Sequence, residues 1–224
     1  MNKYILNIVY GLGALIVISA LAFKIFQPIQ VLPRMQLAPA FLLVDQDNRP
    51  LTSEDLRGQF VIYSFTYTNC PAPCYNINDT VKEIQSRLGE VELNNIPVTF
   101  VTLSIDPERD TAEVLNAYAQ TLGADTTRWK FATTTNQTLL KTVIGVGLET
   151  YYEKKEDGSF AFDPAFVLVD GLGIVRAEYR YATEVSNTDR ILRHLGVLAD
   201  EVKNSTGTNK LAYEAAHLFL CYAP

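Results

Sequence analysis

Residues 60–74 read FVIYSFTYTNCPAPC, and this stretch indicates the fold because an apolar run leads directly into two cysteines. Residues 60–65 form a nearly continuous apolar run, which is typical of a central strand covered on both faces. Cys70 and Cys74 occupy the loop that follows, and helical spacing begins at Val81. We therefore expect both cysteines just beyond the carboxyl end of a buried strand, where open α/β sheets place their sites.

Strands and helices alternate outward from this stretch. Residues 98–103 predict a second buried strand, and Asp110 with Glu113 forms a capping-box pattern that opens a helix to residue 122. Other predicted elements are a strand at 41–44, a helical turn at 53–58, a strand at 129–131, a helix at 138–144, hairpins at 149–162 and 165–179, and helices at 189–202 and 210–222. This order predicts an α/β fold with a mixed central sheet flanked by helices.

Composition limits the class of protein. The 224 residues are 48% hydrophobic and 20% charged, which indicates one globular domain with a short appendage. Three cysteines are too few for a disulfide-stapled scaffold. The net charge is −6, and all the acidic residues follow Arg34, so the chain is not expected to bind nucleic acid.

Residues 4–23 contain no charged side chain. A run of this length predicts a single-pass transmembrane helix, with a cleaved signal peptide as the alternative. Either alternative places the domain on the extracytoplasmic (periplasmic) side of the cell membrane, where disulfides persist. The expected organisation is an anchor at 1–26, a tether at 27–37, a domain at 38–203, and a linker with an amphipathic C-terminal helix at 204–224.

The cysteine pair carries the predicted chemistry. Two thiols separated by three residues can form a disulfide or bind one soft metal ion, and two thiolates favour Cu(I). A helix N-terminus near the pair would stabilise a thiolate. Two buried, inert cysteines are the alternative, and the prolines at 71 and 73 argue against it because they stiffen a loop rather than fill a core.

The order of these features resembles the SCO/SenC family. The matching segments are 38–45, 56–58, 63–74 and VTFVTLSIDPERDT at 98–111, and the likeness extends to about His194. The resemblance implies a thioredoxin-like fold and delivery of copper to the CuA centre of cytochrome c oxidase. It also implies that Cys70 and Cys74 are the copper ligands and that Asp106 with Pro107 forms a turn near the site.

One departure from the family pattern concerns the third copper ligand, a histidine about eight residues before the acid that ends the last central strand. Counting back from Asp170 reaches Phe162, and no histidine occurs from 137 to 181. Pro164 instead occupies the position where thioredoxin-like reductases carry a cis-proline facing their cysteines, with an ordinary trans-proline as the alternative. Loss of the imidazole predicts that Cu(I) binds better than Cu(II), or that no copper binds stably.

Three further groups of residues could bind a metal, but other roles are expected for them. His217 and Cys221 share a helix face and could form a soft-metal pair, although a docking role for this helix is favoured. His194 is expected at the surface. The acids at 106, 108 and 110 are interpreted as turn and capping residues rather than a metal cluster.

Together with the cysteine pair, the resemblance to the SCO/SenC family implies a copper chaperone and thiol-redox assembly factor acting in electron transport. It also implies cytochrome c oxidase subunit II, or an assembly factor of that enzyme, as the partner. The alternative is an extracytoplasmic thiol–disulfide oxidoreductase that uses Cys70 and Cys74 without stable copper binding.

Overall fold

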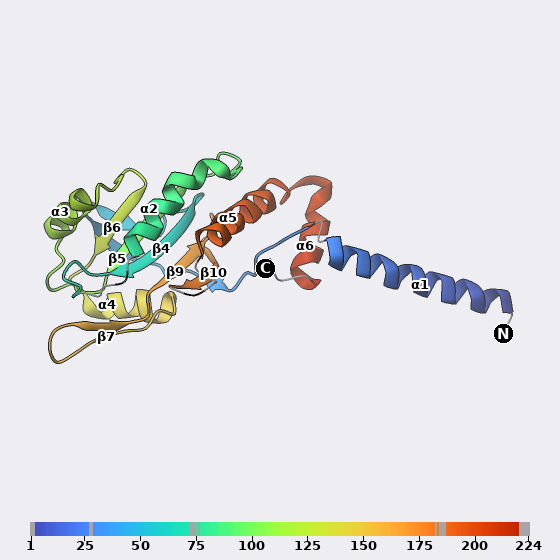
Figure 1. The fold of residues 1–224 in the computed structure, drawn as a ribbon, viewed down its shortest axis with the longest axis horizontal. Coiled ribbons are helices and arrows are strands. Elements are labelled where there is room, and N and C mark those ends of the chain that lie inside the picture. The colour runs from blue at the N-terminus through green and yellow to red at the C-terminus, as the bar shows by residue number, and fades with distance from the viewer. Residues whose placement is uncertain are drawn as a thin grey trace.

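The computed structural model describes residues 3–26, 29–71, 75, 77–181, 183 and 187–219. Within them, the main sheet has the strand order β1-β10-β9-β4-β5-β6-β2-β3, and β7 pairs with β8 in a separate hairpin (Figure 1). The strands are β1 (Gln36–Leu37), β2 (Leu42–Asp45), β3 (Pro50–Thr52), β4 (Phe60–Thr66), β5 (Val98–Ser104), β6 (Trp129–Thr133), β7 (Tyr152–Lys154), β8 (Phe160–Phe162), β9 (Ala165–Val169) and β10 (Ile174–Arg180).

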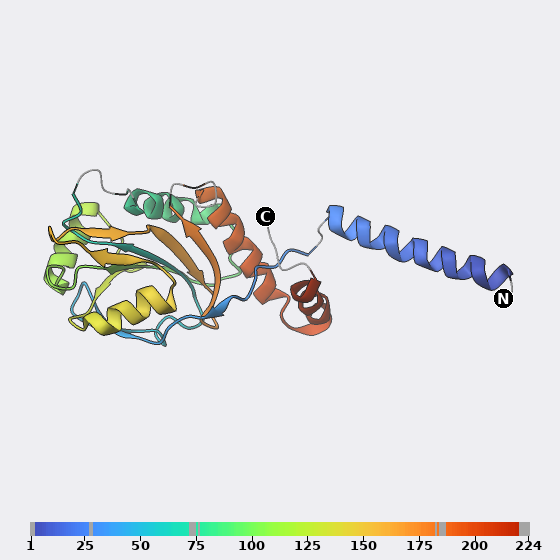
Figure 2. The same cartoon turned by 90° about the horizontal axis from the view of Figure 1, so that it is seen from below.

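The sheet is mixed, which confirms the predicted α/β class. β4 pairs in parallel with β5 and antiparallel with β9, and β5 pairs in parallel with β6. Every residue of β4 is buried, because α2 (Ile77–Arg87) and α5 (Thr188–Lys203) cover one face of the sheet and α4 (Gln137–Lys141) lies on the other (Figure 2). Coverage on both faces explains the continuous apolar run in the sequence.

Local hydrogen bonds set the helix boundaries. α3 (Ala112–Leu122) begins after Thr111, whose side chain accepts from the backbone N–H of Val114. The prediction that Asp110 is the N-cap was therefore wrong by one residue. α4 continues into a π-helical turn (Thr142–Gly147), so the helix predicted at 138–144 ends three residues later than expected. The helical turn predicted at 53–58 is instead a series of turns.

The two terminal helices lie outside the sheet layers. α1 (Lys3–Phe26) extends away from the domain, and α6 (Lys210–Phe219) follows α5 through a short 3-10 turn (Gly207–Asn209) (Figure 1). Among the helices of the described residues, none has both the length and the hydropathy that crossing a membrane requires. The transmembrane anchor predicted over residues 4–23 is therefore not confirmed.

Candidate functional site

Cys70 lies four residues beyond the end of β4, in the segment that leads towards α2. Its side chain is half-buried against the core, and its sulfur is disulfide-bonded. The other two cysteines, Cys74 and Cys221, lie outside the described residues. The predicted position of Cys70 at the carboxyl end of a buried strand is confirmed, whereas its pairing with Cys74 stays a prediction.

Asp110 holds the backbone that leads to Cys70. Its buried carboxylate accepts from the Thr68 backbone N–H at 3.0 Å and from the Thr68 hydroxyl at 2.5 Å. The Ser104 hydroxyl, at the end of β5, donates to the same carboxylate at 2.5 Å. One buried acid therefore ties together the ends of two neighbouring strands and fixes the start of the cysteine loop.

Asp106 closes the turn beside this acid. Its carbonyl oxygen accepts from the backbone N–H groups of Arg109 and Asp110, which agrees with the predicted turn role. Its carboxylate is buried, and the Nε of Arg109 lies 2.8 Å from Oδ2. Desolvation raises the pKa of the Asp106 carboxyl, because burial penalises the charged form more than the nearby guanidinium stabilises it.

Aromatic side chains connect both flanks of the cysteine loop to the β7–β8 hairpin. Tyr67, before Cys70, has its ring 5.0 Å from that of Phe160, and its hydroxyl accepts from the Phe160 backbone N–H at 3.3 Å. The ring of Tyr75, just after position 74, lies 5.3 Å from the ring of Phe162. Phe162, the position reached by counting back to the family's histidine, therefore lies beside the loop.

Pro164 lies between β8 and β9, one residue before β9 begins. Its carbonyl oxygen accepts from the backbone N–H of Tyr181 at 2.8 Å, and the ring of Tyr181 lies 5.8 Å from that of Tyr75. Tyr181 therefore connects Pro164 to Tyr75, which follows the cysteine loop. The predicted cis bond facing the cysteines stays a prediction.

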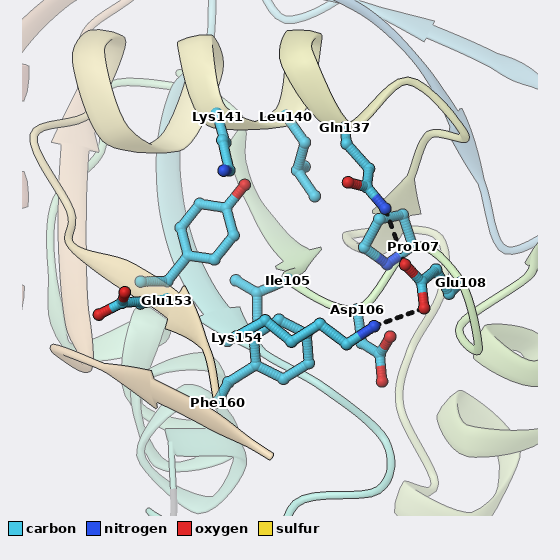
Figure 3. A pocket seen from close by; sticks show the side chains of 11 residues that line it. Ile105, Asp106, Pro107, Glu108, Gln137, Leu140, Lys141, Glu153, Lys154 and Phe160 are labelled. Carbon is cyan, nitrogen blue, oxygen red and sulfur yellow. Dashed lines mark hydrogen bonds and ion pairs between the residues drawn. The ribbon is translucent and has the colours of Figure 1, made fainter. Parts of the chain in front are cut away.

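A cavity of about 250 Å³ is lined by Phe160 together with residues of the Asp106 turn, of α4 and of β7 (Figure 3). The carboxylate of Glu108 accepts from Gln137 of α4 at 2.8 Å and pairs with Lys154 of β7 at 2.5 Å. Lys154 lowers the pKa of the Glu108 carboxyl. This cavity could not be predicted from the sequence, because its lining combines three segments that are far apart along the chain.

Both histidines make contacts elsewhere in the fold. His217 Nε2 lies 2.8 Å from Glu201 Oε1, which favours the docking role of the C-terminal helix. His194 is only 5% exposed, and its Nδ1 lies 2.7 Å from the Tyr179 hydroxyl, so its predicted surface position was wrong. Within the described part of the chain, no three His, Cys, Asp or Glu side chains are grouped so that they could hold a metal ion.

Fold and site define a thioredoxin-like α/β protein with a disulfide-bonded cysteine at the carboxyl end of a central strand. The family model described as SCO1/SenC matches residues 30–222, and the chain belongs to that family. This confirms the resemblance inferred from the two sequence motifs.

Individual relatives agree with this assignment. The SCO2-like protein RP587 of Rickettsia prowazekii is 31% identical over 123 residues, which cover 51% of this chain and 56% of that protein. The fold matches BsSco, a member of the Sco family of cytochrome c oxidase assembly proteins, with a TM-score of 0.67 and 22% identity over 78% of this chain and 98% of BsSco. It also matches Arabidopsis thaliana ScoI with copper bound, with a TM-score of 0.61 and 23% identity over 71% of this chain and 98% of ScoI.

Proposed function

We propose that this protein handles copper and thiol–disulfide chemistry during assembly of the CuA centre of cytochrome c oxidase. The observation that carries the proposal is the position of Cys70 in a SCO1/SenC chain. Its side chain is half-buried and disulfide-bonded, just beyond the carboxyl end of the central strand β4. Copper-bound ScoI and the description of the BsSco family support the same role. Cytochrome c oxidase subunit II, or one of its assembly factors, is the proposed partner.

In the copper role, the reduced forms of Cys70 and Cys74 hold Cu(I) as two thiolates. The ion passes to thiolates of the client by ligand exchange, and the oxidation states of copper and sulfur do not change. Cu(I) is favoured because soft thiolates suit it, whereas Cu(II) prefers additional nitrogen or oxygen ligands. The two histidine side chains contact Glu201 and Tyr179 instead.

The second candidate function is thiol–disulfide exchange without stable copper binding. In that role one thiolate attacks a client disulfide, and the other resolves the mixed disulfide. The client gains two electrons and two protons, and Cys70 with Cys74 becomes a disulfide. The disulfide at Cys70 and the lack of a histidine from 137 to 181 favour this candidate.

Membrane association completes the proposal. The uncharged residues 4–23 bear exposed apolar side chains along α1, including Ile8, Leu12 and Ile16. An extracytoplasmic position of the domain fits the disulfide bond at Cys70 in the structure, because disulfides persist in that compartment.

An anaerobic Cu(I) titration of the reduced full chain against bicinchoninate tests the proposal. We expect one Cu(I) per chain, lost in Cys70→Ser and in Cys74→Ser and retained in the matched control Cys221→Ser. Stoichiometric Cu(I) binding by either of the first two variants would refute the proposed site. Rapid reduction of a client disulfide without Cu(I) binding would favour the second candidate.

A further inference from the structure

β10 has a free outer edge over its second half. In the main sheet β10 lies between β9 and β1, and β1 pairs only with Ile174 and Val175. The rest of β10, up to Arg180, pairs with β9 on its inner side, and no strand of the described residues lies on its outer side. An edge of this kind presents unpaired backbone N–H and C=O groups, to which a strand from another chain can pair.

Hydrogen bonds indicate which backbone groups of β10 point outward. The Tyr181 backbone N–H donates to the Pro164 carbonyl oxygen at 2.8 Å, on the β9 side. Because successive peptide groups of a strand point to opposite sides, Glu178 and Arg180 face the outer side. The Thr183 hydroxyl donates to the Arg180 carbonyl oxygen at 2.6 Å. Among the described residues, the Arg180 N–H and both backbone groups of Glu178 remain available to an added strand.

A cavity of about 420 Å³ follows this free edge, and we call it the β10 groove. Residues 177–180 of β10 form one side of it, and the tether contributes Leu32 and Met35. α5 contributes Arg190 and His194. Met35 is 48% exposed, so apolar surface is available at the tether side of the groove. A strand added to β10 would therefore gain apolar contacts as well as main-chain hydrogen bonds.

One guanidinium in the β10 groove lacks a partner. The Nε of Arg190 is buried without a hydrogen-bond partner, and within the described part of the chain Arg190 forms no ion pair. The other two arginines of the groove differ, because Arg180 pairs with Glu178 at 3.7 Å and Arg176 pairs with two buried acids. A buried donor without a partner is unfavourable, and a carboxylate is the acceptor that suits a guanidinium best. The groove therefore favours an acidic ligand.

The free edge leads towards the cysteine loop. β10 ends at Arg180, and the ring of the next residue, Tyr181, lies 5.8 Å from the ring of Tyr75. Residues 177–180 give roughly 13 Å of edge, at about 3.3 Å per residue. A segment bound along this edge would therefore lie close to the loop that bears Cys70.

We propose that the β10 groove docks the client protein, through an extended segment that pairs with Glu178 and Arg180 and places a carboxylate against Arg190. This docking rests on the proposed function, because a client must reach the cysteines to exchange copper or electrons with them. In strand addition, main-chain hydrogen bonds provide affinity and side-chain contacts provide specificity. The segment is therefore acidic where it faces Arg190 and apolar where it faces Leu32 and Met35.

Fluorescence anisotropy of short labelled peptides, mixed with the full chain in detergent, tests the docking site. The probe alternates valine and glutamate. Its matched controls carry glutamine in place of glutamate, or N-methyl groups on alternate backbone nitrogens. We expect the probe to bind about tenfold more tightly than either control, because it alone offers both carboxylates and a continuous row of N–H groups. Arg190→Met should abolish the preference for glutamate, whereas Arg193→Met, at an exposed position of α5 outside the groove, should keep it.

A second variant tests the strand pairing from the side of the protein. Glu178→Pro deletes an outward N–H, a change that edge strands tolerate, and it should weaken binding of the probe. Equal binding of the probe and its controls, or an unchanged glutamate preference in Arg190→Met, would overturn the proposal. A dimer of the full chain that Glu178→Pro converts to monomers would also overturn it, because a second copy would then occupy the edge. Probe binding involves neither copper nor a disulfide, so failure of docking and failure of the copper proposal give separate results.

Discussion

The carboxylate of Asp110 accepts a hydrogen bond from the backbone N–H of Thr68, at 3.0 Å and across 42 residues of sequence. Thr68 lies two residues before Cys70, so a buried acid after β5 controls the path of the loop after β4. The DPERD segment at 106–110 therefore serves the cysteine site through structure, with its last acid as the anchor. Asp106 forms a turn and Asp110 anchors the loop, so these structural roles account for both acids without a bound metal.

Asp110→Asn should loosen the cysteine loop. An amide can accept at one oxygen only, so at least one of the three donors loses its partner, which costs about 1–3 kcal/mol of unfolding free energy. Urea unfolding measures this loss, and the alkylation rate of reduced Cys70 reports the mobility of the loop. The matched control is Asp125→Asn, because exposed Asp125 accepts from the N–H and hydroxyl of Thr127 in the same way. The control should lose much less stability than Asp110→Asn and leave the alkylation rate unchanged, because Asp125 is exposed and distant in sequence from the cysteine loop. An unaffected loop in Asp110→Asn would contradict the anchoring role.

Ionisation of the buried Asp106 carboxyl should lower the free energy of unfolding as the pH rises. Its folded pKa is raised by burial, so the folded state keeps the proton at pH values where the unfolded state, near the ordinary value of about 3.9, has lost it. Unfolding free energy therefore falls as pH rises from the unfolded pKa to the folded pKa, and then stays level.

Relative to Asp106→Asn, the wild-type chain should thus become less stable from pH 4 upward, as measured by urea unfolding at several pH values. Asp157→Asn is the control, and here the pH dependence of the stability difference should have the opposite sign. Hydrogen bonds from Ser159 lower the pKa of exposed Asp157, so its ionisation adds stability as pH rises. A flat difference between wild type and Asp106→Asn would show that desolvation does not dominate at this acid.

Arg176→Met should destabilise the domain by about 3–5 kcal/mol, because it leaves two buried carboxylates without their cation. Arg87→Met is the matched control, since Arg87 also pairs with several acids but lies at the surface, where such pairs contribute little. Urea unfolding of both variants at pH 7 gives the comparison. A similar loss of unfolding free energy in the two variants would mean that burial does not determine how much the Arg176 ion pairs with Asp170 and Glu201 stabilise the domain.

Much of the fold could be predicted because its central strands are buried on both faces. The apolar runs at 60–65 and 98–103 identify β4 and β5 without knowledge of their partners. The place of Cys70 follows from the same argument, because the strand end determines where the loop begins. Cys74 lies outside the described residues, so its predicted role, which comes from the spacing of the pair and from the family resemblance, stays a prediction.

Residues whose role depends on distant partners could not be predicted. Arg176 follows an alternating pattern that suggests an exposed strand face, yet Asp170 and Glu201 allow its burial. His194 adjoins Arg193 on an amphipathic helix, and only the hydroxyl of Tyr179 on β10 accounts for its position inside. Local periodicity carries no information on such pairings, since they arise when strands and helices pack.

Phe162→His should restore a Cu(II) site. The ring of Phe162 lies 5.3 Å from that of Tyr75 and 6.1 Å from that of Tyr67, so an imidazole there would stand beside the cysteine loop. Nitrogen added to two thiolates suits Cu(II), and we expect a thiolate-to-copper charge-transfer band and at least tenfold tighter Cu(II) binding. Losing the aromatic contacts should cost roughly 1–3 kcal/mol of unfolding free energy.

The matched control for this variant is Tyr151→His, which adds an exposed imidazole on the same approach to the hairpin. It should bind Cu(II) only weakly and without the charge-transfer band. Combining Phe162→His with Cys70→Ser should abolish the band, because the band requires a thiolate ligand. A folded Phe162→His protein with unchanged Cu(II) affinity would show that position 162 is not where the family's histidine acts.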